Sequence, residues 1–331
     1  MKELENIVRA LLAPDAAPSV LATLVSVEGS SYRRPGARLL LQENGVRTGS
    51  ISGGCLEEDV LARSRDVAKT GRAHAVVYDT TSENDLVWGV GLGCHGVVRV
   101  LIEKLPPRPV WAAALAENFA AGRSTALAVS HGGDDASQLG SRLGSPASAE
   151  QAAGIFFETV PPPTMLAIFG AGDDAQPLAR FAHELGWRIT IADPRAAFAT
   201  AARFPQADRV IAAPATELVT RVAPSPDALA VVMTHHYVHD VPVLRALLSR
   251  PLAYLGLLGP RKRAERILAD LDREDFSPTA TPSDRLHAPI GLDIGSNTPE
   301  QVALAIVAEI QSVLAGRDAR PLRERTRPIH A

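Results

Sequence analysis

Beyond residue 163 the chain alternates between short apolar runs and amphipathic stretches of helical length, and this alternation constrains the fold more than any other feature. Alternating strands and helices are typical of a parallel sheet with helices on both faces. The sequence therefore predicts a doubly wound α/β domain in this half. The expected strands are residues 165–169, 188–192, 209–212, 228–233, 252–257 and 289–294, and a long helix is expected over 299–315.

A glycine-rich turn follows the first of these strands. Residues 170–175 match the G-x-G-x-x-A pattern of dinucleotide-binding folds, and Asp193 ends the next strand about 20 residues further on. We expect a Rossmann-type crevice in which Gly170 and Gly172 approach the cofactor and Asp193 binds ribose hydroxyls. The two aspartates that follow Gly172 would, however, repel a pyrophosphate at the helix N-terminus. Binding of NAD(P) therefore stays open.

Two more loops leave the carboxyl ends of expected strands, which is where ligands of open α/β sheets bind. Residues 234–240 hold three histidines, so His235 is a candidate for binding metal or phosphate or for moving a proton. The alternative is that Asp240 caps the next helix and the histidines are solvated. Residues 259–263 place Arg261 and two further cations at a helix N-terminus, which is unfavourable unless an anion binds there. A solvated basic face is the rival interpretation.

The chain length of 331 residues suits two domains. The proline run at 161–163 is the best candidate for a linker, because it is stiff and lacks N–H donors. Before it, strands at 19–27, 37–42, 73–78, 97–103, 125–129 and 156–160, a few helices and a mobile loop over 131–153 indicate an α+β domain. The predicted organisation is an α+β domain at 1–160, the linker at 161–163, a Rossmann-like domain at 164–316 and an arginine-rich tail at 317–331.

The composition excludes several classes of function. The formal net charge of −3 gives no electrostatic case for nucleic acid or an anionic membrane as a partner. Two cysteines do not make a disulfide framework, and the charged N-terminus does not resemble a signal peptide. No apolar run is long enough to span a membrane. We expect a cytoplasmic protein.

Both cysteines lie in glycine-rich turns. Cys55 follows Gly53 and Gly54 and opens a helical stretch, and Cys94 lies in the turn 89–96. A thiol at a helix N-terminus meets free N–H groups and the positive end of the helix dipole, which favour the thiolate. One interpretation is a reactive or ligand-binding site at these turns. The other is a pair of buried or incidental thiols.

Taken together, these motifs resemble the XdhC/CoxI family of accessory proteins for molybdenum hydroxylases such as xanthine dehydrogenase. Residues 29–37 (GSSYRRPGA) resemble the family's G-S-x-x-R-x-P-G-A loop, and residues 49–57 (GSISGGCLE) resemble its G-x-I-x-G-G-C-x-E signature. Residues 91–96 (GLGCHG) resemble its second glycine–cysteine loop. The matching segments of the second half are residues 169–172, 193–195, 234–235, 254–259, 289–295, 298–300 and 308–310.

This resemblance implies a chaperone-like function: binding the molybdenum cofactor, assisting the exchange of an oxo for a sulfido ligand, and handing the cofactor to the apo-hydroxylase. Carried to this chain, Cys55 would contact molybdenum or accept sulfur, with Glu57 beside it. Gly53, Gly54 and Cys94 would complete the glycine–cysteine part of the cofactor site.

The resemblance also implies the ligand and the partners. The cofactor would be molybdopterin or its cytosine dinucleotide form, and Arg33, Arg34 or the cations at 261–263 would suit its phosphates. The partners would be a molybdenum hydroxylase apoenzyme and a cysteine desulfurase, with a homodimer as the default assembly. Two rival functions stay open: an NAD(P)-dependent oxidoreductase, and a nucleotide-sensing regulatory module without chemistry.

Overall fold

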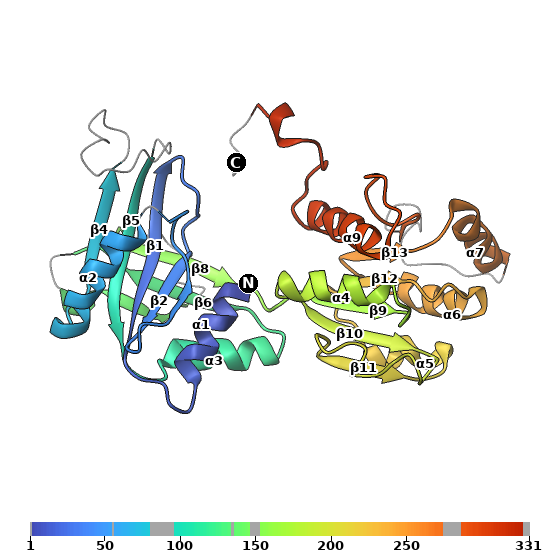
Figure 1. Ribbon diagram of the computed structural model, residues 1–331, viewed down its shortest axis with the longest axis horizontal. Helices are drawn as coiled ribbons and strands as arrows, with labels where there is room; N and C mark the ends of the chain where they lie inside the picture. The colour runs from blue at the N-terminus through green and yellow to red at the C-terminus, as the bar shows by residue number, and fades with distance from the viewer. Residues whose placement is uncertain are drawn as a thin grey trace. The chain divides into compact units, whose positions relative to one another are not determined.

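A computed structural model describes residues 2–54, 56–79, 96–133, 136–145, 153–273 and 286–326. Cys55, Cys94 and the rest of the turn before Gly96 therefore lie outside the described residues. The chain divides into two compact units, Met1–Pro162 and Pro163–Ala331, each with its own sheets (Figure 1). In the described ranges, no helix combines the length and the apolar character that crossing a membrane requires.

The first unit is an α+β domain built on two antiparallel sheets. The larger sheet has the strand order β3-β2-β1-β5-β4, and the smaller has the order β7-β6-β8. The helices and strands are α1 (Lys2–Leu12), β1 (Ser19–Gly29), β2 (Arg38–Gln42), β3 (Arg47–Gly49), α2 (Glu57–Thr70), β4 (His74–Asp79), β5 (Gly96–Leu105), α3 (Val110–Ala120), β6 (Thr125–Ser130), η2 (Ala136–Gln138), β7 (Gly140–Leu143) and β8 (Ile155–Val160).

Strand β1 lies at the centre of the larger sheet and is buried on both faces, which explains its almost continuous apolar sequence. Because side chains of a strand alternate between faces, Val20 and Leu24 pack in a cluster with α2, whereas Leu21 packs with α1 and α3. Val25 contacts Val129 of the smaller sheet. Helices and the second sheet thus cover the two faces of one central sheet.

The expectation of a mobile loop over residues 131–153 is wrong in one part, because β7 lies within it and pairs with β6. Its sequence, Gly140 to Leu143, contains one apolar residue, so hydrophobic periodicity could not reveal it. The buried carboxylate of Glu103 accepts hydrogen bonds from the backbone N–H of Ser141 at 2.9 Å and from its hydroxyl. A long-range polar contact therefore helps to hold this strand.

The second unit contains a six-stranded parallel sheet with the order β11-β10-β9-β12-β13-β14. Numbered from its first strand this is the order 3-2-1-4-5-6, the doubly wound arrangement of Rossmann folds. The fold class predicted from the sequence is confirmed. The elements are β9 (Met165–Phe169), α4 (Ala175–Glu184), β10 (Arg188–Asp193), β11 (Arg209–Ala212), α5 (Ala215–Val222), β12 (Leu229–Val232), α6 (Tyr237–Leu248), β13 (Tyr254–Leu257), α7 (Arg261–Arg273), β14 (Leu286–His287), α9 (Pro299–Leu314) and η4 (Leu322–Glu324).

Helices α4 and α9 pack on one face of this sheet, and α5, α6 and α7 pack on the other. The strand expected over residues 289–294 is wrong: the last strand is β14, before Pro289. Pro289 has no N–H for a ladder, and the N–H of Gly291 donates instead to the carboxylate of Glu309 on α9 at 2.9 Å. The carboxyl ends of β9, β10, β12 and β13 meet at one edge, with the switch point between β9 and β12.

Candidate functional site

In the first unit, three loops that carry the sequence motifs lie side by side. Gly53 lies against the ring of Tyr32, so that a Cβ at position 53 would touch the ring at 3.7 Å. Gly96, where the second glycine–cysteine loop ends, packs on the backbone of Ser30, and a Cβ there would also lie 2.9 Å from the carbonyl oxygen of Glu28. Only glycine allows this approach. The fold therefore gathers motif residues from the 29–37, 49–57 and 91–96 segments.

The turn before α2 is ordered by Ser52 and Glu57. One oxygen of the Glu57 carboxylate accepts the backbone N–H of Ser52 at 2.9 Å, and the other accepts its hydroxyl. The Ser52 hydroxyl oxygen in turn accepts the N–H groups of Gly54 at 3.1 Å and Leu56 at 3.2 Å. Glu57 thus fixes the residues on either side of Cys55 in the sequence. Its predicted role beside a metal or sulfur site stays a prediction.

Helix α1 holds two of the motif loops together through Glu3. One carboxylate oxygen of Glu3 forms an ion pair with the guanidinium of Arg33 in the first loop. The other oxygen accepts the backbone N–H of Ser50 in the second loop at 2.7 Å. This link was not predicted from the sequence, because the partners lie 30 and 47 residues from Glu3 along the chain.

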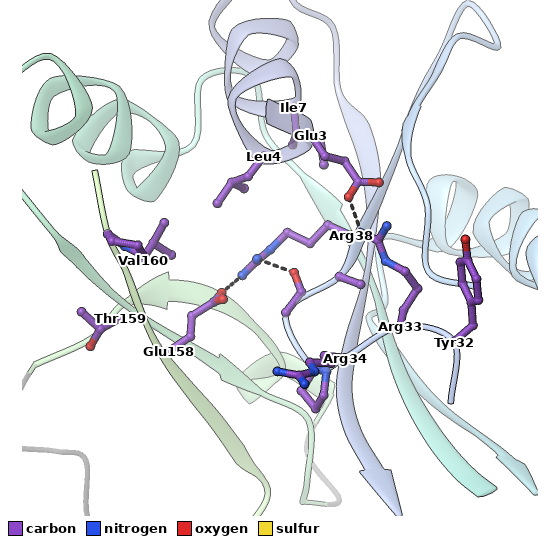
Figure 2. Close-up of a pocket in the computed structure, with 14 residues that line it drawn as sticks. Glu3, Leu4, Ile7, Tyr32, Arg33, Arg34, Arg38, Glu158, Thr159 and Val160 are labelled. Atoms are coloured by element: carbon purple, nitrogen blue, oxygen red, sulfur yellow. Dashed lines mark hydrogen bonds and ion pairs between the residues drawn. The ribbon is translucent and has the colours of Figure 1, made fainter. Parts of the chain in front are cut away.

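A cavity of about 440 Å³ opens beside these loops. Its polar wall is made by Tyr32, Arg33, Arg34, Arg38, Glu3 and Glu158. Figure 2 shows Arg38 reaching toward Glu158 of β8, with Leu4 and Ile7 of α1 nearby and Arg34 on the other side. The cavity therefore combines three guanidinium groups with two carboxylates and an apolar side.

Arg38 is the most buried of these cations, with 4% of the residue exposed. Its guanidinium forms an ion pair with Glu158 and donates to the carbonyl of Gly36 at 2.8 Å. Its Nε is buried and has no hydrogen-bond partner among the described residues. A buried donor without a partner destabilises the folded state, so the other contacts of Arg38 must offset the unfavourable burial of its Nε.

In the second unit, Gly170 begins the turn at the carboxyl end of β9. It has a φ of +126°, and a Cβ there would lie 2.5 Å from the carbonyl carbon of Met233, which follows β12. Gly170 is therefore required by the close approach of two backbone segments at the switch point. A Cβ at Gly172 would meet a carboxylate oxygen of Asp174, which folds back over that position.

Asp193 lies at the carboxyl end of β10 and is fully buried. Its carboxylate accepts the backbone N–H of Ala171 at 2.7 Å and of Arg195 at 2.8 Å, and forms a two-pronged ion pair with the Arg195 guanidinium. Burial alone would raise the pKa of Asp193, but these hydrogen bonds hold it below its ordinary value. Both oxygens of the carboxylate predicted to bind ribose therefore accept hydrogen bonds from nearby residues of the chain. The ribose contact stays a prediction.

Asp174 and His235 form a pair across the switch point. Asp174 precedes α4, His235 lies in the loop between β12 and α6, and Asp174 Oδ2 lies 2.6 Å from His235 Nε2. This hydrogen bond raises the pKa of His235, whereas its partial burial acts in the opposite direction. His235 also adopts a φ of +61°, which is uncommon for a residue with a Cβ. The structure thus places the predicted His235 after the carboxyl end of β12, beside the switch point.

A cluster of polar side chains, formed by Thr234, Asp240 and Arg263, holds the loop that carries His235. The hydroxyl of Thr234 donates to the carboxylate of Asp240 at 2.5 Å, and Asp240 forms an ion pair with Arg263 of α7. Burial raises the pKa of Asp240, and the contacts with Thr234 and Arg263 oppose that rise. Arg261, the cation proposed from the sequence, is exposed at the first position of α7. The cation of this segment that contacts the loop after β12 is Arg263, through Asp240.

No group of three or more potential metal ligands occurs in the ranges that the structure describes. Cys55, Cys94 and His95 lie outside those ranges. Neither the ion pair of Arg38 with Glu158 nor the pair of Asp174 with His235 was predicted from the sequence, because the partners are 120 and 61 residues apart. The Ser52–Glu57 contact joins residues only five apart. It is not a capping box, because the N-cap of α2 is Leu56 and receives no side-chain hydrogen bond.

Comparison with known proteins decides the family. Residues 13–79 match the model of the XdhC and CoxI family, and residues 166–310 match the model of the XdhC Rossmann domain. A Bacillus subtilis protein described as a probable xanthine dehydrogenase subunit is 33% identical over 320 residues, which cover 90% of this chain and 94% of the relative. The chain belongs to the XdhC and CoxI family.

Two further proteins match this chain over most of their length. The molybdenum cofactor insertion chaperone PaoD of Escherichia coli is 25% identical over 297 residues, which cover 89% of this chain and 83% of PaoD. The crystal structure of a xanthine dehydrogenase from Bacillus halodurans superposes with a TM-score of 0.82 at 30% identity, covering 98% of this chain and 99% of that one. Both units of the present chain therefore have counterparts in a solved structure.

Proposed function

We propose that this chain is an accessory protein of a molybdenum hydroxylase, which binds the molybdenum cofactor, assists its sulfuration and inserts it into the apoenzyme. The similarity to a probable xanthine dehydrogenase subunit and to a molybdenum cofactor insertion chaperone supports this function. The observation that carries it is the convergence of three motif loops beside a cavity with an arginine-rich wall.

The residues of this cavity fit an anionic cofactor. The pterin of the cofactor carries a phosphate, and arginine binds phosphate through two parallel hydrogen bonds. Arg33 and Arg34 line the cavity at the partly exposed side, and buried Arg38 has an Nε donor without a partner in the described part of the chain. We assign Arg33 and Arg34 to the phosphate, and Tyr32 to the rim beside the Gly53 turn.

The glycine–cysteine turn would serve the metal end of the cofactor. The molybdenum cofactor supplies the redox-active metal that the client hydroxylase needs. The Ser52–Glu57 contacts order the residues that flank Cys55 in the sequence. Thiolate is a suitable ligand for a soft metal, and we propose that Cys55 contacts molybdenum or accepts sulfur from a cysteine desulfurase.

A ligand analysis tests this proposal. The protein would be purified without oxygen from a host that makes molybdopterin, denatured, and assayed for oxidised pterin, molybdenum and nucleotides. We expect the wild type to release pterin with molybdenum. In the double variant R33Q/R34Q the amount of bound pterin should fall by about tenfold or more, because each substitution removes a charge-assisted hydrogen bond to the phosphate. The matched control is R9Q/R123Q, which removes two cations outside this cavity.

Two further outcomes bear on the proposal. Nucleotide without pterin, even after added cofactor, would favour the oxidoreductase or the nucleotide sensor instead. A Cys55→Ser variant that supports sulfuration of the client as well as the wild type would remove the role of the thiol, while leaving cofactor binding by the cavity intact.

A further inference from the structure

A second cavity lies on the other side of the first unit's larger sheet, away from the motif loops. Four side chains form one row across four strands, because Arg47 pairs with Leu41, Leu41 with Val20, and Val20 with Lys104. Directly opposed residues of an antiparallel sheet point to the same face. The row therefore has two apolar residues in its centre and a cation at each end.

Helix α2 covers the same face of the sheet. Val20 and Leu41 belong to the apolar cluster that α2 completes with Val60 and Val67. Between the second half of α2 and the row lies a cavity of about 480 Å³. This is within the range of about 300–1,000 Å³ that small-molecule sites occupy.

Leu61, Arg65 and Lys69 line the cavity from α2, and Pro18 lines it from the segment before β1. Glu43 of the β2–β3 turn is the acidic residue of the lining. The cavity therefore has an apolar floor and a rim that is mostly cationic.

The charge of this rim is not balanced by the protein. Arg47, Arg65 and Lys69 are exposed and make no ion pair with any residue that the structure describes, and Lys104 donates to the backbone carbonyl of Ala68 at 2.7 Å. Arg65 and Lys69 are four residues apart on α2, a spacing at which like charges repel. Several other arginines of the described chain pair with carboxylates, as Arg33, Arg38, Arg195 and Arg263 do. Four cations against one carboxylate stand out in a chain of net charge −3.

We propose that this cavity binds a small organic phosphate with an apolar body. The cations of the rim bind the phosphate, and the floor made by Val20, Leu41 and Leu61 buries the body from water. The cavity lies between a helix and a sheet and has the volume of a small-molecule site, which favours a small ligand over a macromolecular partner. The inference does not rest on the proposed function, since the motif loops and Cys55 play no part in it.

Calorimetric titration with phenyl phosphate and with inorganic phosphate tests this inference on the full chain at low ionic strength. We expect saturable binding of phenyl phosphate, about tenfold or more tighter than inorganic phosphate, because the ring buries apolar surface. The variant R65Q/K69Q should weaken the binding of phenyl phosphate by about tenfold or more. The control R9Q/R123Q makes the same change of charge outside the cavity and should change affinity less than about twofold.

A second variant separates a filled cavity from a charged surface. Leu61→Trp occupies the cavity and keeps every cation, so it should also weaken binding of phenyl phosphate, with far-UV circular dichroism and melting temperature showing that the fold is retained. The inference is overturned if the wild type shows no saturable binding, if the control loses affinity as much as R65Q/K69Q, or if a folded L61W binds like the wild type.

Discussion

Glu57 and Asp193 each lie next to a glycine-rich loop, and the oxygens of both carboxylates accept hydrogen bonds from residues in or beside that loop. Glu57 binds the backbone and the hydroxyl of Ser52, and Asp193 binds Ala171 and Arg195. Charged acceptors bind N–H groups more strongly than neutral ones, so each carboxylate makes its loop rigid. Such residues position a site, and their removal would loosen the loop before it changes any chemistry.

The pair of Asp174 and His235 makes a prediction about pH. In Asp174→Asn the imidazole loses its anionic partner, so we expect the pKa of His235 to fall, although Asp240 and Arg263 continue to act on it. The pKa of His235 is raised in the folded wild type, so the stabilisation that the pair provides is fully present below the unfolded value of about 6.5 and is lost as pH rises through the folded pKa. NMR titration of the His235 ring protons, in the wild type and in Asp174→Asn, measures the two folded-state pKa values.

Asp173→Asn is the matched control for this prediction. Asp173 pairs with Arg203 instead of His235, so its replacement should leave the pKa of His235 close to the wild-type value. An unchanged pKa in Asp174→Asn would show that the pair does not form in solution.

At the scale of elements, the turn between β9 and α4 is determined by its neighbour β12. Gly170 approaches the backbone after β12 so closely that a side chain has no room. A glycine at the first position of a dinucleotide-binding pattern is therefore needed here for the packing of strands, whether or not a nucleotide binds. The pattern alone could not separate these two reasons.

Gly170→Ala should be strongly destabilising. Its Cβ would meet backbone atoms of Met233, which cannot rotate away, in addition to the strain of a positive φ. We expect a loss of about 3 kcal/mol or more in the free energy of unfolding of the second unit. Gly259→Ala is the control, since φ is +137° there but the nearest atom, on the flexible Arg263 side chain, is 3.4 Å away. Scanning calorimetry that finds equal losses would refute the packing argument.

At the scale of the whole molecule, each unit has its own apolar cores. Among the residues that the structure describes, three clusters lie within 4–160 and two within 165–310. A unit with its own core can in principle fold alone. We propose that the domain boundary lies in the proline run at 161–163.

Separate production of residues 1–162 and 163–331 tests this boundary. Each fragment should unfold in one cooperative thermal transition, because each compact unit keeps its own apolar cores. A cut between Gly186 and Trp187 is the control, because it separates α4 from β10 within one core and should leave fragments without a cooperative transition. A fragment 163–331 that melts without cooperativity would place the boundary elsewhere.

Much of the fold could be predicted because it depends on local patterns. The strands β9, β10, β12 and β13 are apolar runs between turn residues, and α9, expected over 299–315, begins with a capping box of Thr298 and Gln301. Strand β7 was missed and the strand at 289–294 was wrong, because polar contacts of Glu103 and Glu309 with distant residues decide those segments. Periodicity carries no information about such contacts.

The sequence by itself determined the parallel sheet of the second unit, the family, and the motif loops around Gly53, Gly170 and Arg33, since each depends on residues that are neighbours along the chain. Tertiary structure alone decided which groups meet: Glu3 with Arg33 and Ser50, Arg38 with Glu158, and Asp174 with His235. It also decided the row across four strands that has Arg47 at one end and Lys104 at the other. The physical reason is that a charge in a sequence shows its sign but not its partner, and only strand register and helix packing bring partners within hydrogen-bond distance.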